Sequence, residues 1–361
     1  MTTLKVIRLR PEGAFRTDLR SDTLWGLICW GIRAVYGNER LEAFLRAYTQ
    51  DKQPPLLLSS AFPYVQDGEQ LEYFLPNPLF LPQAAASRQS RSLEERKAEA
   101  TGRKKLKKLK WLTKSQFERL LAAGDKRRAL LQIVQEMENA ESLLSVRILS
   151  EERVHIGVNR LTGGTKMESG AGLVFHAEEK YVIGQKRRKQ GKKKNEQLPE
   201  AGLYFLYHAE PETEAMMLGA LRFMSHIGLG GNRSIGKGKF TVQQPEPFEL
   251  QLPAQTNVQV SVSLCSPTEE DIRHMQAHAA LTAYELETRQ GETGFLYNAT
   301  KQGVPCLKEG SVLPGKPDNP YYGKLTKVSI LAKSQVPVDI PHDLYHYGFA
   351  LSIPAYYPQP D

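Results

Sequence analysis

Cysteine is scarce in this chain, with three residues among 361. Cys29, Cys265 and Cys306 are odd in number and far apart, which is typical of reduced, mostly buried thiols. No apolar run is long enough to span a membrane. The first residues, Met1–Val6, lack the apolar stretch of a signal peptide. We therefore expect a cytoplasmic protein.

Signatures of nucleotide chemistry are incomplete. Residues 231–237 fit the pattern G-x-x-x-x-G-K, but Gly238 stands where a P-loop needs Ser or Thr to hold Mg²⁺. The dinucleotide pattern G-x-G-x-x-G fails at Arg233. No nucleophile elbow of the G-x-S-x-G type and no paired-carboxylate signature occurs. The sequence therefore predicts no catalytic residue, no cofactor and no enzyme activity.

Charge is biased towards the positive. The chain has 48 Lys and Arg against 40 Asp and Glu, a formal net charge of +8. This excess favours a nucleic acid or another anionic partner. The hydrophobic fraction of 40% is sufficient for packed cores, and the length favours two domains.

The most informative segment is rich in glycine and basic residues and runs from Ser225 to Phe240. Glycine accepts positive φ and lets backbone N–H groups approach an anion, while Arg and Lys add charge-assisted hydrogen bonds. We predict that this loop binds a polyanion; a glycine-rich hairpin or helix end without a ligand is the alternative. Its candidate binding residues are Gly228, Gly230, Gly231, Asn232, Arg233, Ser234, Gly236, Lys237, Gly238 and Lys239.

Residues 1–246 are predicted to form one domain. It opens with a strand at Leu4–Leu9 and a helix that Ser21 or Asp22 caps and Gly37 ends. It closes with a helix whose apolar residues recur at helical spacing, the glycine-rich loop and a strand at Phe240–Val242. The helical residues are Met217, Leu218, Leu221, Met224 and Ile227.

A charged helical insertion is predicted at about 84–151. Its basic run Arg103–Lys110 suits either a solvated arm or an RNA backbone contact. Thr113 and Gln116 predict a capping box for the helix that follows. Further on, strand-like segments on both sides of Leu161–Lys166 predict a protruding hairpin. Lys180–Lys194 is predicted to be disordered by itself.

Residues 247–361 are predicted to form a second domain. Val258–Leu264 alternates as a strand, Asp271–Glu287 is helical, and Lys308–Leu313 and Tyr345–Ile353 are further strands. The order of elements suits two α+β domains with antiparallel sheets, both ferredoxin-like, or RRM-like. In the first of these sheets Tyr204, Phe205 and Tyr207 could stack RNA bases, although core packing with one aromatic outward is the simpler interpretation.

Several segments resemble the RAMP superfamily of CRISPR systems and, within it, the fourth Csm subunit of type III-A effector complexes. They are the strand and helix that include Arg20–Cys29, the glycine-rich loop, Glu309–Val312 and Tyr347–Ala350.

That resemblance implies two ferredoxin-like domains without catalytic activity. It implies a subunit that caps the 5′ repeat-derived handle of the guide RNA and docks the large polymerase-like subunit beside backbone RAMP subunits. By the same resemblance the glycine-rich loop would hold handle phosphates, Arg20 and Ser21 would lie near the RNA, and the hairpin with Asn159, Arg160 and Lys166 would be a guide-facing thumb.

Two other functions stay open. RAMP relatives that process guide precursors are metal-independent ribonucleases, often with a catalytic His, and His155 and His226 lie near the expected RNA. A stand-alone RNA-binding module is the other alternative. The pairs His274 and His278, and His342 and His346, share a helical spacing without a nearby Cys, so no metal site is predicted.

Overall fold

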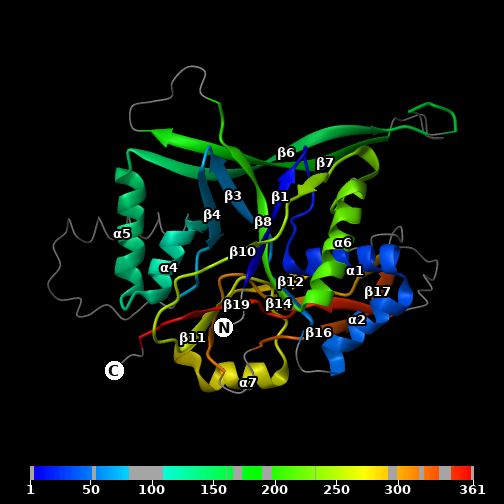
Figure 1. The fold of residues 1–361 in the computed structure, drawn as a ribbon. Coiled ribbons are helices and arrows are strands. Elements are labelled where there is room, and N and C mark those ends of the chain that lie inside the picture. The colour runs from blue at the N-terminus through cyan, green and yellow to red at the C-terminus, as the bar shows by residue number, and fades with distance from the viewer. Residues whose placement is uncertain are drawn as a thin grey trace.

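The computed structural model describes residues 4–50, 54–80, 109–159, 161–165, 173–188, 197–231, 233–291, 299–316, 321–332 and 343–358. Within these ranges the chain forms six α-helices and antiparallel sheets, so the expected α+β class is confirmed (Figure 1). None of the described helices is long and apolar enough to cross a membrane. All three cysteines are free thiols, and two of them are buried.

The largest sheet has eight strands and runs in the order β10-β1-β8-β3-β4-β5, with β9 paired to β1 and β2 to β8. Its strands are β1 (Lys5–Pro11), β2 (Leu56–Leu58), β3 (Phe62–Asp67), β4 (Gln70–Pro76), β5 (Trp111–Thr113), β8 (Glu200–Ala209), β9 (Phe240–Val242) and β10 (Glu246–Pro247). The predicted strands at Leu4–Leu9 and Phe240–Val242 are therefore confirmed.

Helices α1 (Ser21–Tyr36) and α6 (Pro211–Ile227) pack on each other against one face of this sheet, and α2 (Asn38–Gln50) follows α1. Along the chain, β1, α1, β3, β8, α6 and β9 occur in the order strand, helix, two strands, helix and strand, with further elements between α1 and β3 and between β3 and β8. In the sheet these four strands stand in the order β9-β1-β8-β3.

Both faces of the sheet are covered. Leu203, Phe205 and Tyr207 point to the core beneath α1 and α6, whereas Tyr204 and Leu206 point to a second core on the opposite face. This is the alternation that a strand imposes. All three aromatics of β8 are fully buried, so the predicted outward ring and the base-stacking surface on β8 are wrong.

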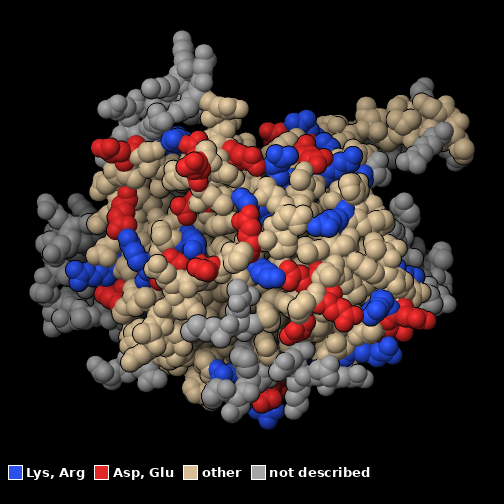
Figure 2. Space-filling model, viewed as in Figure 1, with Lys and Arg blue, Asp and Glu red and all other residues tan. Residues whose placement is uncertain are grey.

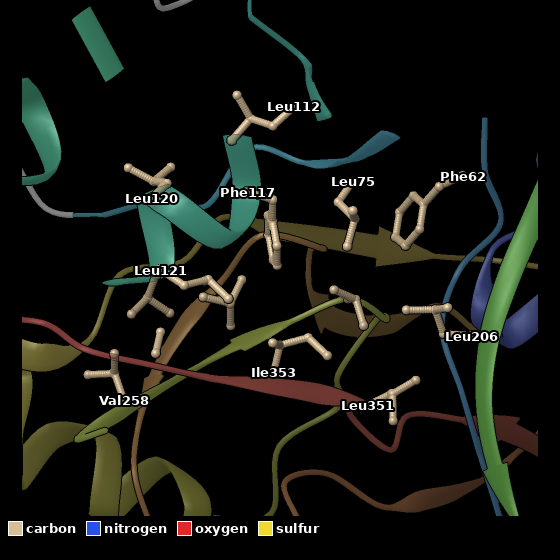
Figure 3. Close-up of a cluster of buried hydrophobic side chains, with 14 of the residues drawn as sticks. Phe62, Leu75, Leu112, Phe117, Leu120, Leu121, Leu206, Val258, Leu351 and Ile353 are labelled. Atoms are coloured by element: carbon tan, nitrogen blue, oxygen red, sulfur yellow. The ribbon is translucent and has the colours of Figure 1, made fainter. Parts of the chain in front are cut away.

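The second core joins the sheet to α4 (Lys114–Ala122) and to the C-terminal strands. Figure 3 shows Phe117, Leu120 and Leu121 of α4 close to Val258 and Ile353, and all five are buried in one cluster. The two segments of the chain that meet at the predicted boundary near residue 246 thus share one core. Helix α5 (Lys126–Asn139) packs against α4.

The C-terminal part contains a three-stranded sheet in the order β15-β11-β19 and several two-stranded pairs. Its elements are β11 (Val258–Ser261), α7 (Glu269–Ala277), β12 (Leu286–Arg289), β13 (Ala299–Lys301), β14 (Val304–Leu307), β15 (Val312–Pro314), β16 (Leu325–Val328), β17 (Ile330–Ala332), β18 (Leu344–Tyr347) and β19 (Ser352–Ala355). The predicted strand Tyr345–Ile353 is divided into β18 and β19, and Gly310, with φ of 88°, turns the chain between β14 and β15.

The helix predicted over Asp271–Glu287 ends at Ala277, ten residues early. A single 3-10 turn follows at Ala279–Leu281, and β12 then pairs with β14. Strand pairing with a distant segment therefore overrides the local helical preference.

The helix caps predicted from the sequence are confirmed in part. The Thr113–Gln116 capping box is present, and α1 ends at Gly37 with φ of 89°. The predicted cap of α1 is wrong, because the helix begins at Ser21 and the N-cap residue is Arg20, whose side chain does not cap it.

A long β-ribbon made of β6 (Ser142–Gly157) and β7 (Leu173–Arg188) crosses one edge of the molecule and projects beyond α6 (Figure 1). The predicted disorder of Lys180–Lys194 is wrong for residues 180–188, which lie in β7; residues 189–194 lie outside the described ranges. The ribbon supplies the reason, since β6 satisfies the backbone of β7 and Val182 packs against the core beneath α1.

Candidate nucleic-acid interface

The glycine-rich loop joins α6 to β9. Gly228, Gly230, Gly236 and Gly238 all have positive φ, between 73° and 100°, and Arg233–Ile235 forms a 3-10 turn. A Cβ on Gly238 would collide with the carbonyl oxygen of Leu229, so this position requires glycine for both its φ and its space.

Many amides of this loop already donate within the protein. The recorded donors and acceptors are Gly228 N to Met224 O (2.9 Å), Leu229 N to Gly238 O (2.6 Å), Gly231 N to Thr17 Oγ1 (2.9 Å), Gly236 N to Arg233 O (3.0 Å) and Gly238 N to Ala14 O (2.9 Å). These bonds fold the loop onto residues 14–17 and engage the amides of most of its glycines within the protein. A phosphate at this loop would therefore be held chiefly by cationic side chains.

One of those cations reaches the β-ribbon. Lys237 Nζ lies 2.8 Å from Glu179 Oε1 on β7, and the hydroxyl of Tyr181 donates to the other carboxylate oxygen at 2.8 Å. Arg153 Nε and His155 Nε2 of β6 lie 3.5 Å and 3.6 Å from the same carboxylate. We call these five residues the Glu179 cluster.

Glu179 is only 2% exposed, whereas the basic side chains around it reach solvent. The hydrogen bond from Lys237 lowers the pKa of this carboxyl against the opposing effect of burial, and the bond from Tyr181 adds to it. The carboxylate is therefore charged at neutral pH. It orients cations from two distant segments towards one surface.

The ribbon is also tied to the segment beneath the loop. Phe15 and Lys180 exchange two backbone hydrogen bonds of 3.1 Å and 2.7 Å, and Lys180 Nζ lies 2.8 Å from Asp18 Oδ1. Figure 2 shows Lys and Arg side chains, with Asp and Glu side chains among them, where the ribbon passes the upper end of α6. Loop and ribbon thus form one continuous surface that carries several cations.

Beyond the Glu179 cluster the ribbon carries exposed apolar and aromatic side chains. Val154 is 61% exposed and Ile156 57%, and the ring of His155 stacks on Phe175 with centroids 5.4 Å apart. Just after β6, the side-chain oxygen of Asn159 accepts a hydrogen bond from Leu161 N at 2.9 Å. An exposed, partly aromatic projection of this kind suits contact with nucleobases.

Two predicted binding residues lie elsewhere. The guanidinium of Arg20 pairs with Glu309 and with Glu287 at 2.7 Å, and Ser21 is buried, where its hydroxyl accepts from Leu264 N at 3.0 Å. Both residues tie the start of α1 to the C-terminal part and not to the loop surface. Arg160, Lys166 and Asn232 lie outside the described residues, as does the side chain of Ser234.

Other histidines are bonded within the fold or lie where the glycine-rich loop begins. His274 Nε2 lies 3.1 Å from Gly315 O, His346 lies 3.3 Å from Cys306 Sγ, and His226 is in the last turn of α6. Among the described residues, no three His, Cys, Asp or Glu side chains are grouped to hold a metal ion. His342 lies outside those residues.

Sequence reasoning missed Glu179, Arg153 and Tyr181. A weak signal was present, because Arg153 and His155 alternate on one face of β6, as Glu179 and Tyr181 do on β7. Their meeting depends on the ribbon register, which pairs Arg153 with Ala177 and His155 with Phe175. That register is a long-range property.

Comparison with known proteins supports a specific relationship. No family model matches the chain. Over 348 residues it is 24% identical to a protein of Thermococcus onnurineus (strain NA1) described as CRISPR system Cms protein Csm4, with 96% of this chain and 95% of the relative covered. The chain is therefore similar to Csm4 along almost its whole length.

Solved structures share its fold. A chain in the crystal structure of a Csm1–Csm4 cassette in complex with cA4 aligns with a TM-score of 0.55 at 20% identity, and 99% of each chain is covered. A chain of the Csm3–Csm4 subcomplex of a type III-A CRISPR-Cas interference complex aligns with a TM-score of 0.52 at 15% identity, over 98% of this chain and 100% of the other.

Proposed function

We propose that this chain is a non-catalytic assembly subunit of a type III-A CRISPR interference complex, which binds the 5′ repeat-derived handle of the guide RNA. Its partners are the large Csm1 subunit and the backbone Csm3 subunit, the proteins that accompany Csm4 in related structures. The full-length relationship to Csm4 supports this assignment.

The observation that carries the RNA-binding role is the Glu179 cluster. A buried carboxylate joins Lys237 of the glycine-rich loop to Arg153 and His155 of the ribbon. With the exposed Lys239 two positions after Lys237 in the chain, this surface presents positive charge to a strand of phosphates. The aromatic and apolar side chains farther along the ribbon contact bases next to the handle, as the thumb assignment requires.

The same proposal includes a ferredoxin-like N-terminal unit. The order strand, helix, two strands, helix, strand and the sheet order β9-β1-β8-β3 both support it. Among the described residues after β10, the chain forms a single α-helix and a three-stranded sheet with several strand pairs. The second ferredoxin-like domain and the boundary near residue 246 stay predictions.

A salt titration tests the RNA contact. Wild type, Lys239→Ala and Arg153→Ala are compared for binding to a single-stranded RNA with the repeat-derived 5′ end. Each lost phosphate contact reduces the slope of log K against log salt by about 0.7 to 1. Arg40→Ala, at an exposed ion pair with Glu212, is the control and keeps the wild-type slope. Equal slopes in all four proteins would remove this surface from the proposal.

A ribonuclease is the second candidate, because the structure gives His155 an acidic neighbour in Glu179. Proton transfer by an imidazole is what metal-independent RNA cleavage uses. Incubating the purified protein with precursor guide RNA decides between the two. Cleavage that His155→Ala abolishes would establish the ribonuclease, whereas intact RNA at binding concentrations supports the assembly role.

A further inference from the structure

The segment that connects β1 to α1 lies against the glycine-rich loop. Its residues 12–18 are called the connector below. Gly238 N donates to Ala14 O at 2.9 Å, and Gly231 N donates to Thr17 Oγ1 at 2.9 Å. The connector also exchanges two backbone hydrogen bonds with strand β7 of the ribbon. Its backbone is therefore held by the loop and by the ribbon, which fixes where its exposed side chains begin.

Thr17 and Gly230 fit together closely. Gly230 has a φ of 88°, and a Cβ on it would lie 2.7 Å from the Cβ of Thr17. Glycine is therefore the residue that leaves room for Thr17 at this position. Because Thr17 also accepts the hydrogen bond from Gly231 N, its side chain fixes the connector relative to two successive glycines of the loop.

Arg16 precedes Thr17 and is exposed. A Cβ on Gly231 would lie 3.3 Å from Cδ of Arg16, so the aliphatic part of this arginine lies along the backbone of Gly231. Cδ carries the guanidinium group. The charged end of Arg16 therefore begins at the surface of the glycine-rich loop, although the two segments are far apart in the sequence.

Arg233 of the loop itself lies in the same way on another glycine. A Cβ on Gly228 would lie 3.2 Å from Cγ of Arg233 and 3.5 Å from its Cβ. Two glycines thus leave space for the aliphatic parts of two arginines, one from the connector and one from the loop. Positioning these arginines gives the glycines a role that does not require free amides.

The acidic side chains of the connector bond to other segments. Asp18 pairs with Lys180 of the ribbon at 2.8 Å, and Glu12 accepts a hydrogen bond from the hydroxyl of Thr241 at 3.0 Å. Arg16 adds a guanidinium group to a loop that already carries one arginine and two lysines. A guanidinium group can bind two oxygens of one phosphate at once, whereas an ammonium group acts as a point charge.

We propose that Arg16 is a further phosphate-binding residue of the guide RNA site and that Gly231 positions its side chain. This assignment rests on the RNA-binding function proposed above. It adds the connector, for which the sequence predicted no contact, to the loop and the ribbon. The group that Arg16 binds is a phosphate of the RNA backbone.

A salt titration with a single-stranded RNA that has the repeat-derived 5′ end tests the role of Arg16. Arg16→Ala should reduce the slope of log K against log salt by about 0.7 to 1. Arg16→Lys keeps the charge and the slope but should bind more weakly, because it cannot bind two oxygens at once. The control is Arg128→Ala, at an exposed residue of α5, which lies at the far end of the molecule from α6 (Figure 1). It should keep both slope and affinity.

Gly231→Ala tests the positioning of Arg16. Gly231 does not have a positive φ, so the backbone accepts alanine, but the new Cβ displaces the side chain of Arg16. We expect a loss of at least about threefold in RNA affinity from Gly231→Ala alone, and no further loss when it is added to Arg16→Ala. Melting temperatures verify that each variant is folded.

Three results would overturn parts of this assignment. The wild-type slope in Arg16→Ala would remove Arg16 from the site, and the proposed function would stand if Lys239→Ala and Arg153→Ala still lowered the slope. Wild-type affinity of Arg16→Lys would show that charge alone matters and not the guanidinium geometry. Equal losses from Gly231→Ala in both backgrounds would overturn its positioning role. A wild-type protein that does not bind this RNA would contradict the proposed function itself.

Discussion

Lys237 and Glu179 form an ion pair of 2.8 Å between the glycine-rich loop and the β-ribbon, 58 positions apart in the sequence. The pair fixes the loop to the ribbon and aims the surrounding cations at one surface. It therefore links the stability of this region to its proposed RNA contact.

Replacing Lys237 tests how much the ion pair with Glu179 contributes to stability. Lys237→Ala leaves a buried carboxylate without its closest cation, and we expect a loss of about 1–3 kcal/mol in the free energy of unfolding. Adding Glu179→Gln removes the uncompensated charge, so the double variant recovers much of that loss. Urea denaturation of both proteins measures the difference. A double variant as unstable as Lys237→Ala would show that the pair is not the source of the effect.

The Lys237–Glu179 pair also predicts that the stability of the protein falls in acid. The pKa of Glu179 in the folded protein lies below its ordinary value of 4.5, chiefly because Lys237 donates to it. Its stabilising effect is therefore complete above that value and is lost as the pH falls through the lowered pKa. The melting temperatures of wild type and the double variant should converge in acid and differ at neutral pH. A constant difference would contradict this assignment.

A comparison of Gly236 and Gly238 distinguishes the cost of a positive φ from the cost of a steric clash. Both have positive φ, but a Cβ on Gly236 meets open space, whereas one on Gly238 meets the Leu229 carbonyl. Gly236→Ala should lose roughly 1–2 kcal/mol of stability from its φ alone. Gly238→Ala should lose clearly more, as measured by chemical denaturation. Equal losses would show that the close approach to Leu229 is not structurally important.

Arg20 is expected to matter for stability and not for RNA. Arg20→Ala leaves the partly buried Glu287 and Glu309 without their common partner, which should destabilise the protein by about 2–4 kcal/mol. Arg40→Ala breaks an exposed pair and should change stability by less than about 1 kcal/mol. Denaturation and RNA titration on both variants check this. Weaker RNA binding by a stably folded Arg20 variant would restore the predicted RNA role of Arg20.

Because Lys126 is buried, we predict that the stability of the protein changes with pH in the alkaline range. Its ammonium group is buried, donates to Leu120 O and Leu121 O, and lies 4.5 Å from the ring of Phe80. Burial lowers its pKa from 10.5 to about 7. Between these values the unfolded chain binds the proton that the folded chain has released, so stability contributed by this site rises with pH.

Replacing Lys126 tests whether this lysine causes the rise in stability with pH. Lys126→Met should lack it, whereas Lys114→Met, which changes a partly exposed lysine of the neighbouring helix α4, should keep it. Unfolding free energies from neutral to alkaline pH provide the comparison. An identical pH profile in wild type and Lys126→Met would mean that Lys126 titrates as an exposed lysine does.

Local patterns predicted local structure well. The capping box at Thr113, the stop at Gly37 and the strand at Phe240–Val242 need only neighbouring residues. The failures have long-range causes. Strand β12 forms because β14 lies beside it, and residues 180–188 are ordered because β6 pairs with them.

At the candidate site, too, local features were predictable from the sequence and long-range contacts were not. The basic character of the loop was predictable from Arg233, Lys237 and Lys239, but the use of its amides in internal hydrogen bonds was not. The Glu179 cluster depends on how a hairpin folds back over a loop far along the chain. The ion pairs of Arg20 were not predictable, because its acidic partners, Glu287 and Glu309, are brought to it by the fold.

The most direct test of the proposed function is purification of the tagged protein from its native host, followed by sequencing of the bound RNA and identification of the bound proteins. We predict guide RNAs that share one repeat-derived 5′ end, together with the large Csm1 subunit. Heterogeneous RNA without protein partners would contradict the proposed function.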